Sequence, residues 1–328
     1  MRLFSCERSI AQNCIMPTVS LVVPCYNIYS FLSATLESVR SQDFGDWEII
    51  LVDDGSEDDT WSIISRFMAL DSRIRGLRKS NEGTASARNY GFSKASSTSA
   101  YIFFLDHDDQ LEPNALTRLT RYMDTHPEVG LLACQYQDIS ADGRRLGTGH
   151  RSRWAPGAIL PHEMQGNEID TPFEVFFCGT GQGPFALYRR SIYAQTEGWE
   201  TAFWPHEDSD MFCQMALLAK VHFLPDQLYL KRIHAAQGMN DGARVQRAYT
   251  AFRAKWDKRA PRNNHEEDLF RKARRYYYAT HGPCRDLKVA RKAFAEFFSD
   301  QRRPTFKWGI KLVVSALYRM LFYRIRRP

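Results

Sequence analysis

Short apolar runs alternate with amphipathic stretches along most of the chain. The apolar runs are too hydrophobic for a sheet face that meets water, and apolar residues at helical spacing separate them. This alternation predicts an α/β fold in which a mostly parallel, doubly wound sheet is flanked by helices. The expected strands cover residues 20–24, 48–52, 101–105, 129–136, 185–188 and 221–230. The expected helices cover residues 30–42 and 58–70, a stretch that begins at Pro113, residues 209–219, and much of the chain from about 244 onward.

Local signals refine these bounds. Ser56 precedes Asp59 by three residues, a spacing typical of a helix start, so Ser56 is expected to cap the second helix. Gly83 and Gly91 are expected to allow tight backbone at helix ends. Residues 140–172 are rich in glycine, arginine and polar groups with weak periodicity, which predicts a long functional loop region.

The net charge of +6 conceals an asymmetry. Residues 1–240 hold 21 basic and 30 acidic side chains, a net charge of −9, whereas residues 241–328 hold 23 and 8, a net charge of +15. The acidic part argues against a nucleic-acid groove, so no nucleic-acid partner is expected. The basic part favours phosphate or an anionic membrane surface.

Cysteine usage and hydropathy exclude further classes. The seven cysteines are scattered and form no C-x-x-C pair, which favours a reducing compartment over a disulfide framework or a zinc site. No apolar segment has the length of a signal-peptide core near the N-terminus or of a membrane span elsewhere. We therefore expect a cytoplasmic protein that has neither a signal peptide nor a membrane-spanning helix.

Two of the expected strands end in acidic clusters. The second strand runs into Asp53 and Asp54, and the third runs into Asp106, Asp108 and Asp109. Ligands of parallel sheets bind at the carboxyl ends of the strands, so both clusters lie where a site is expected. Mg²⁺ or Mn²⁺ would relieve the repulsion between the carboxylates and could bridge a diphosphate. For one cluster alone, a solvated turn that ends a strand is the alternative.

Five motifs, in order, resemble those of the family-2 glycosyltransferases with the GT-A fold. They are VSLVVPCYN at 19–27, DDGS at 53–56, NEGTASARNYG at 81–91, LDHDD at 105–109 and ED at 207–208. The resemblance covers about residues 18–237. It implies transfer of a sugar from a nucleotide diphosphate to an acceptor hydroxyl, with inversion at the anomeric carbon.

The same resemblance implies a domain organisation. Residues 18–240 would form the GT-A catalytic domain, with a nucleotide-sugar half near 18–137 and an acceptor half near 138–240. An N-terminal extension, 1–17, would precede it. A helical, basic C-terminal region, 241–328, would follow.

The resemblance also assigns the metal residues. Asp106 and Asp108 match the family's D-x-D motif, in which the first acid faces the ribose and the second holds the divalent cation, Mn²⁺ or Mg²⁺, on the diphosphate. Both are therefore candidate metal residues. The cation would neutralise charge on the departing diphosphate. His107 is expected only to occupy the turn.

Further donor contacts follow from the same resemblance. Pro24 and Tyr26 would line the base pocket, and Tyr26 could stack on the base. Asp53 or Asp54 would hydrogen-bond the base. The other expected contacts are Arg88 with the nucleotide and His234, in the R-x-H segment that begins at Arg232, with the diphosphate or the metal. By family frequency the base is expected to be uracil, and guanine and thymine stay open.

Glu207 and Asp208 match the family's acidic pair at the start of a helix beside the acceptor. Asp208 is the expected general base, because a carboxylate there can take the proton of the attacking hydroxyl. Glu207 is expected to position it. The alternative is a pair of acids favoured by the helix dipole. Residues 140–183 are expected to select the acceptor.

The basic C-terminal region contains a segment typical of an amphipathic helix. Lys311, Ser315 and Arg319 lie on one stripe of an otherwise apolar helix over 306–327, which fits a helix in an anionic membrane interface. The alternative is a helix docked on the catalytic domain. Peripheral attachment to the inner face of the plasma membrane is the expectation. Two helices are expected before it, around 266–278 and 286–298.

Three hypotheses follow. The first is a metal-dependent inverting glycosyltransferase that adds single sugars to a glycan or glycolipid acceptor in cell-surface polysaccharide, lipopolysaccharide or glycolipid synthesis. The second is a catalytically silent sugar-nucleotide-binding scaffold of the same fold. The third, a sugar-nucleotide pyrophosphorylase, lacks support because Pro24–Asn27 stands where a glycine-rich phosphate loop would be needed.

Overall fold

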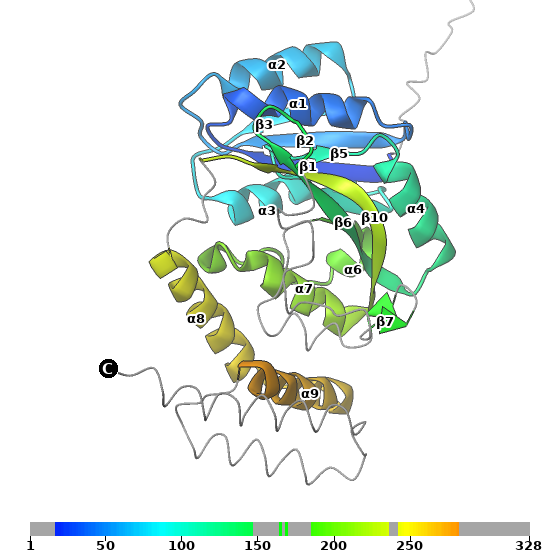
Figure 1. The fold of residues 1–328 in the computed structure, drawn as a ribbon, viewed down its shortest axis with the longest axis vertical. Coiled ribbons are helices and arrows are strands. Elements are labelled where there is room, and N and C mark those ends of the chain that lie inside the picture. Colours follow the sequence, from blue (N-terminus) through cyan, green and yellow to red (C-terminus); the bar gives the residue numbers. More distant parts are fainter. Residues whose placement is uncertain (1–16, 147–163, 166–167, 170–184, 236–241, 282–328) are drawn as a thin grey trace, which may run out of the picture. The chain divides into compact units, whose positions relative to one another are not determined.

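The computed structural model describes residues 17–146, 164–165, 168–169, 185–235 and 242–281. The chain divides into two compact units, which we describe separately (Figure 1). The first consists of Met1–Ser152, Pro184–Gln195 and Leu224–His234, and the second of Arg153–Gly183, Thr196–Phe223 and Ala235–Pro328. The acceptor half predicted for 138–240 thus contributes residues to both units.

The first unit is built on a mixed sheet. Its strand order is β3-β2-β1-β4-β9-β6-β10, and the short β5 pairs with β10. The first four strands in this order are parallel, whereas β9 is antiparallel to both β4 and β6. The strands are β1 (Val19–Cys25), β2 (Trp47–Asp53), β3 (Ile74–Arg78), β4 (Tyr101–Phe104), β5 (Gln110–Leu111), β6 (Val129–Ser140), β9 (Ala186–Arg189) and β10 (Lys220–Ile233).

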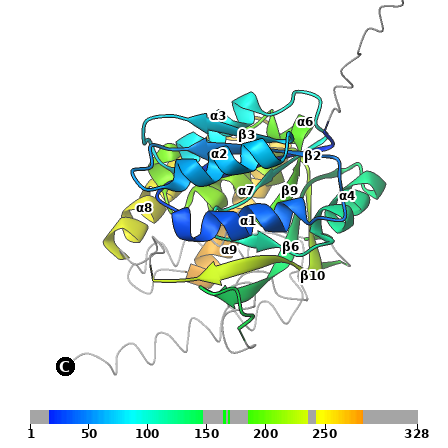
Figure 2. The same cartoon turned by 90° about the horizontal axis from the view of Figure 1, so that it is seen from above.

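Helices cover both faces of the parallel strands. Figure 1 shows α1 and α2 on one side of β1 and β2 and α3 on the other, and α1 and α2 run side by side in Figure 2. Alternate residues of β1 explain this, because Leu21 and Val23 join the core under α1 and α2 while Val22 faces α3. The helices of this unit are α1 (Tyr29–Arg40), α2 (Thr60–Leu70), α3 (Thr84–Lys94), α4 (Ala115–Thr125) and α6 (Arg190–Tyr193).

The six predicted strands are confirmed, and so are the helices predicted at 30–42 and 58–70. The helix predicted from Pro113 begins two residues later, at Ala115. The sequence pattern missed β3 and α3. β3 is only five residues long and contains two arginines and a glycine, and α3 is too polar to show an apolar stripe.

Two local predictions are wrong. Ser56 does not cap α2, because its Oγ accepts a hydrogen bond from Asn27 N at 3.0 Å and Asp59 is the residue before the helix. Gly91 lies inside α3 rather than at its end, where it permits close packing on β1. The prediction for Gly83 is confirmed, since it precedes α3 with a φ of 93° that favours glycine.

The second unit is mainly helical. It contains the hairpin of β7 (Met164–Gln165) and β8 (Glu168–Ile169), which pairs with His222 at the start of β10. Its helices are η2 (Thr201–Phe203), α7 (Glu207–Leu218), α8 (Gly242–Lys258) and α9 (Asn264–His281). The helices predicted at 209–219 and 266–278 are confirmed as α7 and α9. The helices predicted at 286–298 and 306–327 lie outside the described residues. Among the described helices, none combines the length and hydropathy that crossing a membrane requires.

Gly91 provides a stability test. A Cβ at this position would lie 2.4 Å from Val22 Cγ1 and 3.1 Å from Val52 Cγ2, so Gly91→Ala must push α3 away from the sheet. We expect a loss of about 1–3 kcal/mol in the free energy of unfolding, measured by urea denaturation. Gly45→Ala is the matched control, because nothing lies within 4 Å of its Cβ. Equal stability of the two variants would contradict this packing.

Candidate functional site

The loop after β4 holds three carboxylates, and each has its own partner. Asp106 Oδ1 accepts a hydrogen bond from Arg88 Nη2 of α3 at 2.8 Å. Asp108 Oδ2 lies 2.9 Å from His234 Nε2, just beyond β10. The structure therefore brings together four of the predicted donor-site residues, in one ion pair, Arg88–Asp106, and one hydrogen-bonded pair, Asp108–His234.

Asp109 is the most deeply buried of the three carboxylates. Its Oδ2 accepts a hydrogen bond from the hydroxyl of Tyr229, and its Oδ1 accepts one from Arg232 N, both at 2.7 Å. Burial, followed by repulsion from Asp108 and Asp106, raises the pKa of Asp109 well above its usual value. The sequence showed Asp109 in the acidic cluster but gave it no role.

His107 ties this loop to β1 and α1. Its Nδ1 lies 2.6 Å from the carbonyl oxygen of Pro24, and its own carbonyl accepts a hydrogen bond from Thr35 Oγ1 at 2.9 Å. Pro24 is buried in β1, so its backbone rather than its ring makes this contact. The ends of β1 and β4 are thereby joined beside the carboxylates.

The acidic cluster after β2 also has partners. Asp53 is fully buried and accepts hydrogen bonds from Arg78 Nε at 3.0 Å and from Ser56 N at 2.9 Å. Asp54 accepts hydrogen bonds from Gly83 N and Lys79 Nζ, both at 2.8 Å. These contacts fix the loop after β2 and the start of α3.

The carboxylate partners of Lys79 change its pKa. Partial burial alone would lower the pKa of Lys79, but hydrogen bonds to Asp54 and Glu82 outweigh burial and raise it. The lysine therefore stays charged beside Asp54.

Tyr26 stands out from this loop region because it is exposed. Asn27, with a φ of 49°, forms the turn after β1, and its Oδ1 accepts a hydrogen bond from Glu57 N at 2.9 Å. The backbone of the turn is thus held while 43% of Tyr26 stays accessible. A flat ring on a fixed backbone at the end of a parallel strand can stack on a planar ligand.

Glu207 and Asp208, the predicted acceptor-side acids, begin α7 in the second unit. Glu207 is buried and Asp208 is half-buried. Their position in the first turn of a helix favours the charged carboxylates through the helix dipole. His206 precedes them with its ring 5.4 Å from that of Tyr249, and burial lowers the pKa of His206.

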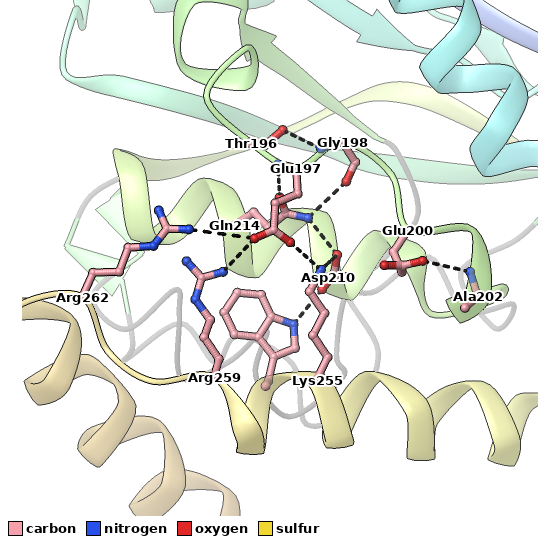
Figure 3. Close-up of polar contacts among 11 residues, drawn as sticks. Thr196, Glu197, Gly198, Glu200, Ala202, Asp210, Gln214, Lys255, Arg259 and Arg262 are labelled. Atoms are coloured by element: carbon pink, nitrogen blue, oxygen red, sulfur yellow. Dashed lines mark hydrogen bonds and ion pairs between the residues drawn. The ribbon is translucent and has the colours of Figure 1, made fainter.

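Asp210, two residues beyond Asp208, anchors α7 to α8 within the second unit (Figure 3). Its carboxylate accepts hydrogen bonds from Trp256 Nε1 at 2.7 Å, Lys255 Nζ at 3.0 Å and Gln214 Nε2 at 2.7 Å. Burial raises the pKa of Asp210, and Lys255 partly offsets that effect. The helix that carries the candidate base is therefore held by an ion pair between the buried Asp210 and the half-buried Lys255, which the sequence pattern did not reveal.

Glu197 completes this cluster. Its carboxylate lies 3.0 Å from Lys255 Nζ and 3.5 Å from Arg259 Nη1, and its backbone N donates to Gln214 Oε1 at 2.7 Å (Figure 3). Burial alone would raise the pKa of Glu197, but Lys255 and the arginines lower it. Lys255 thus stands between two carboxylates.

The described residues contain no cluster of three or more His, Cys, Asp or Glu side chains with the geometry of a metal site. Protein donors for a cation at the loop after β4 are therefore few. The side chains of Asp108 and His234 lie 2.9 Å apart there, and Asp106 is paired with Arg88.

Comparison with known proteins identifies the family and the fold. The family model described as glycosyl transferase family 2 matches residues 20–196, more than half of the chain. The minor teichoic acid biosynthesis protein GgaA of Bacillus subtilis is 34% identical over 209 residues, which are 61% of this chain and 44% of that protein. The matched stretches span 15–44% of the lengths of the curated relatives.

Two solved structures share the fold. S. aureus TarS 1–349 in complex with UDP-GlcNAc gives a TM-score of 0.61 at 15% identity, covering 85% of this chain and 79% of that one. The mannosyltransferase PcManGT from Pyrobaculum calidifontis, in complex with GDP-Man and Mn²⁺, gives 0.53 at 17% identity, covering 93% and 87%. The chain belongs to glycosyl transferase family 2 and has a GT-A fold.

Lys255 offers a test of the α7 anchor. Lys255→Met would leave the fully buried Asp210 without its cation, so we expect a loss of about 2–3 kcal/mol in the free energy of unfolding at pH 7.5. Without the lysine, the pKa of Asp210 in the folded state rises further above its unfolded value. The folded state then binds the proton more tightly, so the loss should shrink as pH falls towards 5.

Urea denaturation at the two pH values measures this effect. Lys272→Met is the matched control, because Lys272 is half-exposed and its pair with Asp268 is worth little. A loss for Lys255→Met that is independent of pH would rule out the ion pair as its cause.

Proposed function

We propose that this protein is an inverting glycosyltransferase that moves a sugar from a nucleotide-diphosphate donor to an acceptor hydroxyl. The observation that carries the proposal is the pairing of Asp108 with His234 at the end of β4, beside the Arg88–Asp106 ion pair. Residues from β4, α3 and the end of β10 converge there, at the carboxyl edge of the parallel strands where α/β sheets bind ligands.

Asp108 and His234 would hold a divalent cation. Their oxygen and nitrogen atoms lie 2.9 Å apart, and neighbouring ligands of an octahedral cation with bonds of about 2.1 Å lie about 3 Å apart. The imidazole nitrogen favours Mn²⁺ over Mg²⁺. When bound, the cation would stabilise negative charge on the leaving diphosphate.

Arg88 supports the donor assignment through Asp106. Its buried guanidinium neutralises that carboxylate, which lowers the repulsion that a second negative group would impose on an incoming diphosphate. Asp106 keeps an oxygen that Arg88 does not use, and we assign it to the ribose side of the donor. The exposed ring of Tyr26 is assigned to the base.

The donor is proposed to be a UDP-sugar. TarS is described with UDP-GlcNAc and PcManGT with GDP-Man and Mn²⁺, so both bases occur on this fold. Pro24, Asp53 and Asp54 would complete the base pocket through the backbone that they hold at the ends of β1 and β2.

Asp208 is proposed as the general base, with Glu207 as its positioning residue. The Asp208 carboxylate lies in the first turn of α7, where the helix dipole stabilises a negative charge. It can therefore take the proton of the acceptor hydroxyl as the oxygen attacks the anomeric carbon from the face opposite the diphosphate.

The acceptor is proposed to be a cell-surface glycan or glycolipid. The similarity to GgaA, a teichoic acid biosynthesis protein, supports this class. Sugar transfer to such an acceptor would take place at the inner face of the plasma membrane, where residues 306–327 would bind anionic lipid. That segment lies outside the described residues, so its role stays a prediction.

Calorimetric binding tests the donor site. UDP, GDP and dTDP are titrated with and without Mn²⁺ into the wild type and into Asp108→Ala. We expect one of them to bind in a Mn²⁺-dependent way, with a loss of at least about tenfold in Asp108→Ala because a metal ligand is gone. Asp226→Ala, which removes an aspartate of β10 that pairs with Arg118, is the control. Nucleotide affinity that is the same with and without Mn²⁺, and the same in Asp108→Ala as in the wild type, would refute the site.

The rate of turnover tests the role of Asp208 as the general base. Release of UDP from the sugar nucleotide that binds should fall about 10²–10⁴-fold in Asp208→Asn, because the amide cannot accept a proton. Donor affinity should not change. Asp257→Asn, an exposed aspartate of α8, should keep full turnover. Full activity in Asp208→Asn would remove the mechanism, and donor binding without any turnover would favour the silent scaffold.

A further inference from the structure

Tyr229, Leu230 and Arg232, near the end of β10, contact the loop after β4 or the short β5 that follows it. The short β5 follows Asp109 directly and pairs with β10, where Leu111 stands opposite Tyr229 and Gln110 opposite Leu230. Asp109 extends this pairing with its side chain, through the Tyr229 hydroxyl and Arg232 N. Asp109 and Tyr229 are both buried, so these hydrogen bonds do not compete with water.

Arg232 makes a second connection to the same loop. Its Nε donates to the carbonyl oxygen of Asp108 at 2.7 Å. Its Nη1 donates to the carbonyl oxygens of Ser140 at 3.1 Å and Ala141 at 2.8 Å, at the end of β6. One guanidinium therefore fixes the backbone of the proposed metal ligand against two strand ends.

The two ligands of the proposed metal site are linked through the same group. The Arg232 guanidinium lies 5.1 Å from the centroid of the Phe31 ring, and the Phe31 ring also contacts His234, with ring centroids 4.6 Å apart. Arg232 and His234 thus share the Phe31 ring as a neighbour. The position of His234 thus depends on how β10 is held.

We propose that Asp109, with Tyr229 and Arg232, is a positioning device that sets the separation of Asp108 and His234 before the cation arrives. None of the three is assigned a contact with the donor. They act by holding β10 against the loop after β4, so that the two metal ligands need no rearrangement. This inference rests on the proposed function, because it assigns the cation to Asp108 and His234.

Tyr229→Phe tests the positioning role by removing a single oxygen atom, that of the Tyr229 hydroxyl. It removes the hydroxyl that donates to Asp109 and keeps the ring that packs on Phe103 and Phe185. We expect the dissociation constant for Mn²⁺ to rise about tenfold, as for other residues that orient metal ligands. MnCl₂ is titrated alone and with the nucleoside diphosphate that binds, and free Mn²⁺ is counted from its electron paramagnetic resonance signal.

Tyr101→Phe is the matched control. Its hydroxyl donates to Asp124 at 2.6 Å, and its ring is as buried as that of Tyr229, but it begins β4 at the end away from the acidic loop. Mn²⁺ affinity should not change in this variant. Arg232→Lys provides a second test, because a lysine cannot reach Asp108, Ser140 and Ala141 together, and it should weaken Mn²⁺ binding as Tyr229→Phe does.

The outcomes separate this inference from the proposed function. Wild-type affinity in Tyr229→Phe and Arg232→Lys, with Mn²⁺ binding lost in Asp108→Ala, would overturn the positioning role and leave the proposed function intact. Equal losses in Tyr101→Phe and Tyr229→Phe would also overturn it, because they would reflect general destabilisation. No binding to the wild type, or unchanged binding in Asp108→Ala, would refute the metal site and this inference together.

Discussion

Repulsion among Asp106, Asp108 and Asp109 is the constraint on which the first unit depends. Three carboxylates within four residues cannot be held at the end of a buried strand unless each has a compensating partner. The fold supplies these from different elements: Arg88 from α3, His234 from the end of β10, and Tyr229 with Arg232 N from β10 itself.

The position of α3 links this constraint to packing far from the carboxylates. Gly91 lets the helix lie close to Val22 and Val52, and Gly83 with Asp54 fixes where the helix begins. Arg88 is one turn before Gly91 on the same helix, so its reach to Asp106 depends on that close approach. In the second unit, Asp210 and Lys255 fix α7 in a comparable way, through an ion pair two residues beyond the candidate base.

Strong periodicity made the buried strands and the amphipathic helices predictable from the sequence. The motifs likewise indicated the family and brought Asp106, Asp108, Arg88 and His234 forward as one site, and the structure pairs these residues. The roles of Asp109 and Lys255 were not predictable, because their partners lie 120 and 45 residues away and no local pattern records such contacts. α3 escaped prediction because a glycine and polar residues replace the apolar stripe.

The central claim is that Asp108 and His234 together hold a cation on the diphosphate of the donor. Electron–nuclear double resonance of Mn²⁺ bound to the protein with UDP measures which nuclei lie next to the metal. We expect coupling to ³¹P of the diphosphate and to one ¹⁴N, with the ¹⁴N coupling absent in His234→Ala. A spectrum without ³¹P coupling, or with the same ¹⁴N coupling in His234→Ala, would contradict it.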